Sequence, residues 1–186
     1  MHTDLKQAVE VLRAGGVILY PTDTIWGLGC DASNTEAVKK IYDIKQRSDE
    51  KSMLVLVNKP TMAQFYVDEI PDAAWDIMEV ADTPTTIILD SAKNLAKNLI
   101  ATDGSIGIRV TSEEFSHKLI ERYKMPIVST SANVSGEKAP AIFDEISDEI
   151  KSKVDYIVNF RQDDLTRAKS SSIIKISNNG LFKILR

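Results

Sequence analysis

The sequence predicts a single α/β domain, residues 1–186, built on a mixed β-sheet flanked by helices. Apolar runs typical of strands alternate with amphipathic helical segments along the chain. A length of 186 residues suits one domain that can bury a core. A hydrophobic content of 43% and a charged content of 27% are those of an ordinary globular protein. No internal repeat, low-complexity tract or interdomain linker divides the chain.

The N-terminal part predicts a helix, a strand and a second helix. Residues 3–14 carry apolar side chains at helical spacing, and a glycine pair follows them. Residues 17–20 form an apolar run that Pro21 ends, which is typical of a short buried strand. Ser33 or Asn34 is expected to cap a helix over about residues 35–45.

The remainder predicts further strands and helices. Strands are expected over residues 53–57, 85–89, 105–110, 126–130, 156–158, 172–176 and 181–185, the last two joined by a hairpin turn at 178–180. Helices are expected from first-turn prolines at Pro60 and Pro71, from a capping box formed by Thr111 and Glu114 and reaching about Tyr123, and over residues 143–152.

The loop after the first strand is unusually polar. Thr22, Asp23, Thr24 and Trp26 precede two glycines that allow close backbone approach. Open α/β sheets place ligands at such strand ends. A binding loop and an ordinary connection, with Thr22 and Asp23 as turn formers and Trp26 in the core, fit these residue types equally well.

Composition excludes several kinds of function. A net charge of -4 argues against a general polyanion binder. One cysteine and two histidines exclude a disulfide, a thiolate cluster and a site of several imidazoles, and no Walker-type phosphate loop is present. No apolar run approaches membrane-span length and no signal pattern opens the chain, so a cytoplasmic location without membrane association is expected.

Three features favour an anion-binding cleft. Lys45, Arg47 and Lys51 form a short basic cluster that is either a phosphate clamp or a solvated loop. Residues 129–136 are rich in hydroxyls and small side chains, and such loops bring backbone N–H groups close to phosphate oxygens. Arg109 ends an apolar strand and should therefore face a carboxylate, either an internal one or that of a ligand. A nucleotide together with a small carboxylate is the expected ligand set.

Four segments carry a resemblance to a known family. They are PTDTIWGLG at residues 21–29, K-x-R at 45–47, SIGIR at 105–109 and STSANVSG at 129–136. In them the chain resembles the YrdC-like family of threonylcarbamoyl-AMP synthases, in the short form without an additional C-terminal domain. The resemblance implies a twisted open sheet with a large concave basic cavity. It also implies a nucleotidyltransferase that makes threonylcarbamoyl-AMP and pyrophosphate from L-threonine, bicarbonate and ATP, for N6-threonylcarbamoyladenosine at position 37 of tRNA.

The resemblance also assigns roles to single residues. It implies that threonine contacts Thr24, Leu56, Arg109, Ser129 and Ser171, with Arg109 on the carboxylate. It implies that ATP contacts Arg47, Lys51, Ser105, Ser131, Asn133, Ala139 and Arg186. Lys45 and Arg47 are the candidate catalytic cations. Leu56 and Ala139 could supply only backbone or apolar contacts.

The expected ligands beyond the substrates are few. Mg²⁺ would arrive with ATP, without protein ligands of its own, and no organic cofactor is implied. Partner proteins from tRNA modification and direct RNA contact are allowed but not required. The main alternative is a non-catalytic RNA-binding module that uses the same basic cavity, although aromatic residues are not interleaved with lysine and arginine. A different carbamoyl transfer and a purely structural subunit are weaker alternatives.

Overall fold

The chain folds around one mixed β-sheet, as the sequence predicts. The structure is a computed structural model, and it describes residues 1–46 and 53–186. Nine strands form the sheet in the order β7-β1-β2-β6-β3-β5-β4-β8-β9. The strands are β1 (Ile18–Tyr20), β2 (Gly27–Gly29), β3 (Leu54–Val57), β4 (Thr85–Leu89), β5 (Ile106–Val110), β6 (Ile127–Ser131), β7 (Tyr156–Ile157), β8 (Ser172–Ile176) and β9 (Phe182–Ile184). Parallel pairing joins β1 to β7, β3 to β5 and β4 to β8, and the other described neighbours are antiparallel.

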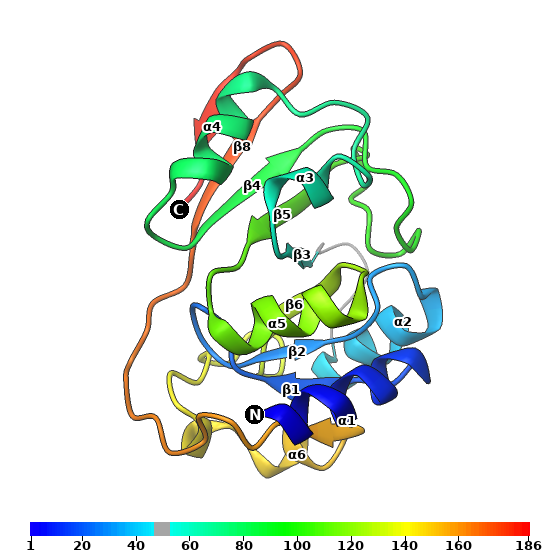
Figure 1. Cartoon of the computed structure of the whole chain (residues 1–186), viewed down its shortest axis with the longest axis vertical. Helices are drawn as coiled ribbons and strands as arrows, with labels where there is room; N and C mark the ends of the chain where they lie inside the picture. The colour runs from blue at the N-terminus through cyan, green and yellow to red at the C-terminus, as the bar shows by residue number, and fades with distance from the viewer. Residues whose placement is uncertain (47–52) are drawn as a thin grey trace.

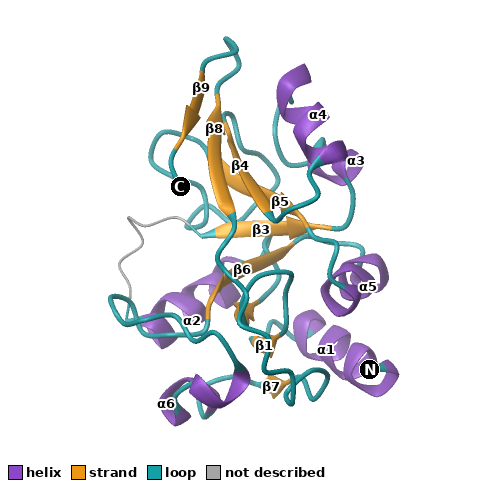
Figure 2. Cartoon of the chain, turned by 90° about the vertical axis from the view of Figure 1, so that its left-hand side faces the viewer, coloured by secondary structure: helices purple, strands orange, loops and turns teal. Residues whose placement is uncertain are grey.

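Helices cover the two faces of the sheet unequally. They are α1 (His2–Arg13), α2 (Thr35–Lys45), α3 (Pro60–Ala63), α4 (Asp72–Val80), α5 (Glu114–Tyr123) and α6 (Asp148–Lys151), together with the 3₁₀ turn η1 (Phe143–Glu145). In Figure 1, α1, α5, α3 and α4 lie in front of the strands. Figure 2 shows these four helices on one side of the sheet, whereas α2 and α6 flank only its lower half on the other side. The upper half of that second face is therefore uncovered by helices.

The strand register separates apolar from polar side chains. Paired residues place their side chains on the same face, and successive residues alternate. Val55 pairs with Ile108, and Ile108 with Ile87, so buried aliphatic side chains line the face under the helices. Leu54 pairs with both Gly107 and Ser129 on the other face. That face, which we call the open face, carries the small and polar residues of these strands.

Several elements agree closely with the sequence prediction. The Asn34 side chain accepts hydrogen bonds from the backbone N–H groups of Glu36 and Ala37 and thereby caps α2. The β8–β9 hairpin turns through Gly180, whose φ of 79° suits glycine. Cys30 is fully buried beside Gly29, as expected of a small apolar residue.

Strand β2 is the main feature that the sequence prediction misses, since residues 27–29 were interpreted as part of a loop. The strand is three residues long, and two of them are glycines, so it carries no β-branched signal. It pairs with β1 on one side and β6 on the other. A side chain at Gly29 would lie 2.6 Å from Cε1 of Tyr20, so the absence of a side chain is what lets this strand pack.

Three predicted helix boundaries are wrong. Helix α4 begins at Asp72 with Pro71 as its N-cap, one residue later than expected. The predicted capping box fails because the Thr111 N–H donates to the carbonyl of Val57, which prolongs the β-pairing, and Glu113 caps α5 instead. The predicted helix over residues 143–152 is split into η1 and α6, because Ser147 is extended and its hydroxyl caps α6.

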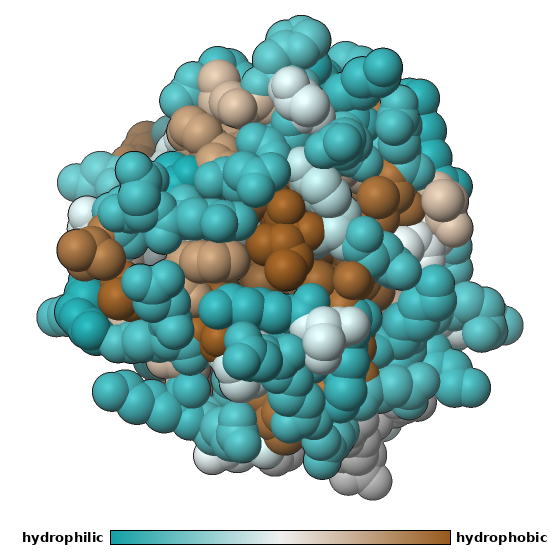
Figure 3. All heavy atoms as spheres, turned by 90° about the horizontal axis from the view of Figure 1, so that it is seen from below, coloured by the Kyte–Doolittle hydropathy of each residue, from teal (hydrophilic) through white to brown (hydrophobic). Residues whose placement is uncertain are grey.

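Figure 3 shows the chain from below, with mostly hydrophilic side chains surrounding an apolar patch near the centre of the view. Within the described residues, the structure contains no helix that combines the length and the apolar character needed to cross a membrane.

Candidate active site

A polar cavity of about 240 Å³ lies on the open face. It is bordered by the loop between β1 and β2, by strands β3, β5 and β6, and by the segment that leads into β8. Six residues that the resemblance links to threonine or ATP line it, namely Thr24, Arg109, Ser129, Ser131, Ser171 and Arg186. The fold thus brings together residues that lie up to 162 positions apart (186 minus 24).

The floor of this cavity depends on the strand register. Ser129 and Ser131 are two residues apart on β6 and therefore point to the same face. Gly27 pairs with Ser131, and a side chain at Gly27 would lie 3.2 Å from the carbonyl oxygen of Thr130 and 3.4 Å from Oγ of Ser129. Glycine at this position keeps the serine hydroxyls accessible.

Arg109 meets a carboxylate of the chain itself. Its Nη2 lies 3.0 Å from Oδ1 of Asp23, and the two side chains are only 3% and 6% exposed. The same Nη2 donates to Oγ1 of Thr24 at 3.4 Å. Sequence reasoning left open whether the partner of Arg109 would be internal or a ligand, and the structure supplies an internal one.

The loop that carries Asp23 and Thr24 is held in place by hydroxyls. Oγ1 of Thr22 donates to the carbonyl of Ile25 at 2.7 Å and lies 3.0 Å from Oγ1 of Thr24. Trp26, 5% exposed, packs against Phe143 with a ring-centroid distance of 4.8 Å. Trp26 lines the cavity as well, so it is both a core residue and part of the cavity wall.

Arg161 fixes that loop from outside the cavity. Its guanidinium lies 2.7 Å from Oδ2 of Asp164 and 3.3 Å from Oε1 of Glu113. It also reaches the carbonyl of Thr22 at 3.5 Å. The segment that contains Arg161 is therefore anchored to both the β1–β2 loop and the start of α5.

The far wall of the cavity is formed near the C-terminus. Ser171 shares a hydroxyl–hydroxyl hydrogen bond of 2.9 Å with Thr86, and its carbonyl accepts from Nε of Arg186. The backbone of Ile173 pairs with that of Arg186. Arg186 is thus bound to the sheet edge by its side chain and its backbone.

Lys45 supports the loop after β6. It is the last residue of α2 and is 2% exposed. Its Nζ donates to the carbonyls of Ser131 at 2.5 Å and Asn133 at 2.7 Å. The Asn133 amide in turn donates to the carbonyls of Val134 and Glu137. Lys45 therefore connects α2 to the predicted phosphate-binding loop, and it does not line the cavity itself.

A second cavity of about 460 Å³ adjoins the first, with Met53 and Leu54 lining both. Ser105 lies here, and both its backbone N–H and its hydroxyl donate to Oδ1 of Asp103. Gly107 lines this cavity and pairs with Leu54, and a side chain at Gly107 would approach Leu54 and Thr86 to 3.3 Å. Of the predicted threonine and ATP residues, Ser105 thus lines the second cavity and six others line the first, whereas Asn133 lines neither.

Asp103 is expected to show a pH dependence that can be measured. The Lys175 ammonium, followed by the hydroxyl and N–H of Ser105, lowers the pKa of Asp103 from 3.8 to about 2. A pKa that is lower in the folded chain stabilises the fold above pH 3.8, and this stabilisation is lost as the pH falls through about 2. Replacing Lys175 by methionine should raise the pKa of Asp103 by about one unit, as followed by carboxyl NMR shifts.

Lys183→Met provides the matched control for that measurement. Lys183 is the exposed residue of β9 that pairs directly with Lys175, and it makes no ion pair with Asp103 among the described residues. The control should leave the Asp103 titration within about 0.3 units of the parent, because exposed charges without contact are screened. An unchanged titration in Lys175→Met would show that Lys175 does not hold Asp103.

The other predicted residues are placed differently. Leu56 is fully buried in β3 beside Arg109 of β5 and lines neither cavity, so its predicted contact with the ligand stays a prediction. Ala139 also lines neither cavity. Arg47 and Lys51 lie outside the described residues, so the predicted basic character of the cavity stays a prediction. Among the described residues, no group of three or more histidine, cysteine, aspartate or glutamate side chains could hold a metal ion.

Sequence reasoning missed some residues of these cavities. Met53, Leu54 and Ser170 line the first cavity, and Lys175 lines the second. Asp23 is predicted to belong either to a binding loop or to an ordinary turn, and the sequence predicts no contact between it and Arg109. The strands that carry Leu54 and Lys175 were predicted, but assigning a residue to the open face requires the pairing register, which no local pattern supplies.

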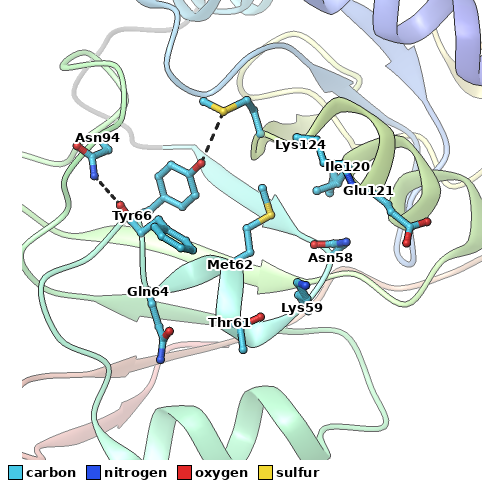
Figure 4. A pocket seen from close by; sticks show the side chains of 12 residues that line it. Asn58, Lys59, Thr61, Met62, Gln64, Tyr66, Asn94, Ile120, Glu121 and Lys124 are labelled. Atoms are coloured by element: carbon cyan, nitrogen blue, oxygen red, sulfur yellow. Dashed lines mark hydrogen bonds between the residues drawn. The ribbon is translucent and has the colours of Figure 1, made fainter.

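A larger cavity lies elsewhere, and none of the predicted site residues lines it. It has a volume of about 640 Å³ and lies between α3 and α5, on the helix-covered side. Figure 4 shows the Tyr66 hydroxyl directed at the sulfur of Met125, 3.9 Å away. Lys59 and Lys124 lie at this cavity together with Glu121, so both signs of charge are present. This mixture does not define a ligand.

Comparison with known families and proteins agrees with the fold. The model of the Sua5/YciO/YrdC family, described as "Telomere recombination", matches residues 10–186. A protein of Pseudoalteromonas translucida named threonylcarbamoyl-AMP synthase is 34% identical over 161 residues, which are 85% of this chain and 86% of that protein.

Two solved structures show the same architecture. Escherichia coli YciO superimposes with a TM-score of 0.85 at 27% identity, covering 100% of this chain and 89% of that one. Sua5 of P. abyssi, solved in complex with L-threonine, has a TM-score of 0.85 at 23% identity. The superposition covers 98% of this chain and 53% of Sua5, so this chain spans about half of that protein. By the extent of the family match, this chain belongs to the Sua5/YciO/YrdC family.

Proposed function

We propose that this chain is a threonylcarbamoyl-AMP synthase that converts L-threonine, bicarbonate and ATP into threonylcarbamoyl-AMP and pyrophosphate. Its product would serve N6-threonylcarbamoyladenosine formation at position 37 of tRNA. The name of the Pseudoalteromonas relative supports this proposal, since that protein matches most of this chain. The observation that carries it is that the buried Arg109 lines a single cavity together with the three predicted threonine-binding hydroxyl residues Thr24, Ser129 and Ser171.

That cavity suits an amino acid with a hydroxyl side chain. The guanidinium of Arg109 would receive the carboxylate in charge-assisted hydrogen bonds. The hydroxyls of Thr24, Ser129 and Ser171 surround it and can both donate and accept hydrogen bonds. A volume of about 240 Å³ accommodates a threonine-sized ligand.

ATP would occupy the adjoining cavity, the loop after β6 and the part of the first cavity that Ser131 and Arg186 line. Ser105, Ser131, Asn133 and Arg186 are the described residues that we assign to it, with Arg47 and Lys51 assigned from the sequence resemblance alone. The nucleotide is proposed to bind as its magnesium complex, with the metal carried as part of the substrate. Bound in that way, the ion supplies charge neutralisation on the triphosphate.

The proposed reaction needs no protein nucleophile. The neutral amine of threonine attacks bicarbonate, from which water leaves, or carbon dioxide, in which case the amine loses a proton to solvent. Both routes give the carbamate. A carbamate oxygen then attacks the α-phosphorus of ATP, the bond to the bridging oxygen breaks, and pyrophosphate leaves. The protein would contribute positioning and neutralisation of charge. It would also keep the labile carbamate from bulk water, in a site walled by the buried Trp26.

A product assay tests this function. The chain is incubated with ATP and bicarbonate, with and without L-threonine, while pyrophosphate and the adenylate mass are followed. We expect pyrophosphate and a threonylcarbamoyl-AMP mass only when threonine is present. Threonine-independent pyrophosphate release would contradict the proposal. Salt-sensitive RNA binding without pyrophosphate release would favour the RNA-binding alternative instead.

A further inference from the structure

Arg109 has a buried carboxylate partner to which the proposed reaction gives no role. Oδ1 of Asp23 lies 3.0 Å from Nη2 of Arg109, and neither side chain is more than 6% exposed. Burial raises the pKa of Asp23, whereas the charge of Arg109 lowers it, and the net effect is a raised pKa. A buried carboxylate stays ionised only where a nearby cation stabilises its charge, so the charge states of Asp23 and Arg109 depend on each other.

The two partners face different cavities. Arg109 lines the candidate active site. Asp23 does not line it, and instead borders a separate cavity of about 190 Å³ near the end of α4, together with Ile87 and Val110. Those two residues belong to the helix-covered face of the sheet. Asp23 therefore approaches the guanidinium from the side away from the candidate substrate.

The internal partners of Arg109 occupy only part of the hydrogen-bonding capacity of its guanidinium. Arginine has five N–H donors in a rigid fork. The described contacts engage only Nη2, which forms an ion pair with Asp23 and a hydrogen bond with Oγ1 of Thr24. Oδ1 of Asp23 and Nε of Arg109 are both buried without a hydrogen-bond partner. Asp23 thus compensates the charge of Arg109 and leaves hydrogen-bonding capacity for a second carboxylate.

We propose that Asp23 is a positioning residue, which holds the Arg109 guanidinium from behind so that its remaining donors meet the carboxylate of the amino-acid substrate. This inference rests on the proposed function. It deepens that proposal by adding a residue behind the substrate site. Thr24 completes the arrangement, because its hydroxyl contacts the same nitrogen of Arg109 that Asp23 contacts.

The test measures the KM for threonine, the KM for ATP and kcat in Asp23→Asn and compares each of them with the parent. We expect the KM for threonine to rise about tenfold or more, with kcat within about threefold and the KM for ATP within about twofold of the parent. Asp163→Asn is the matched control, since Asp163 is exposed and makes no ion pair with the described residues. An Asp23→Asn variant with unchanged KM for threonine, or with both KM values raised equally, overturns the inference.

A double variant separates positioning from a merely structural role. If Asp23 acts through Arg109, adding Asp23→Asn to Arg109→Met should change the KM for threonine by less than about twofold, although Asp23→Asn alone changes it tenfold. The double variant contains neither buried charge, so it remains measurable even where Asp23→Asn alone unfolds. If the rise in the KM for threonine in the double variant equals the product of the rises in the two single variants, the positioning role is contradicted. The parent chain is assayed in parallel, and absence of threonine-dependent pyrophosphate there would refute the proposed function itself.

Discussion

Replacing Arg109 by methionine is expected to raise the KM for threonine by about 100-fold or more and to change the KM for ATP by less than about threefold. Hydrogen bonds to a charged partner are each worth about 1.5–3 kcal/mol, and the carboxylate would lose two of them. The effect is selective because Ser105 and the loop after β6 lie outside the contacts of Arg109. Initial rates at varied threonine and varied ATP measure both constants.

The same replacement leaves Asp23 without its cation, and this gives a second signature. The pKa of Asp23, already raised by burial, should rise further once the guanidinium is removed. A carboxyl whose pKa is higher in the folded than in the unfolded chain costs stability progressively as the pH rises above its ordinary value of 3.8. The Tm deficit of Arg109→Met should therefore be larger at pH 8 than at pH 5.

Arg122→Met is the control for both measurements, since Arg122 is exposed on α5 and makes no ion pair among the described residues. Equal shifts in the threonine and ATP constants of Arg109→Met would show that the carboxylate assignment is wrong. A Tm deficit independent of pH would show that Asp23 does not respond to Arg109.

The sequence predicts most of this fold because periodic patterns are local. Helices α1 and α2 have apolar residues at helical spacing, and β4 coincides with its predicted range because it is rich in β-branched residues. Strand β2 shows the limit of such signals. Two of its three residues are glycines, and its extended conformation is fixed by pairing with β1 and β6, which are distant in the chain.

The candidate site was predictable for residues that belong to the resembling motifs and less so for those that depend on register. Arg109 was expected to face a carboxylate, yet its partner was left open, because the choice of Asp23 depends on how the β1–β2 loop crosses the end of β5. The position of Leu56 likewise depends on the strand register. It shares the open face with Arg109, but it is fully covered there and lines neither cavity.

Replacing Lys45 by methionine is expected to lower threonine-dependent pyrophosphate release by about 100-fold or more, while threonine binding stays within about threefold of the parent. The Lys45 ammonium donates to the carbonyls of Ser131 and Asn133, and without it the loop after β6 loses two charge-assisted hydrogen bonds. Threonine binding should persist because Arg109 and Ser129 are fixed by β5 and β6 themselves.

Two measurements on the same preparation decide the role of Lys45. Calorimetric titration with threonine reports the first cavity, and pyrophosphate release reports the complete reaction. Lys39→Met is the control, since Lys39 lies on the same helix but is exposed. Because buried carbonyls left without donors are costly, the Tm of Lys45→Met should fall by several degrees. Parallel loss of threonine binding and activity would indicate general unfolding. Retained activity would show that Lys45 has no role in the reaction.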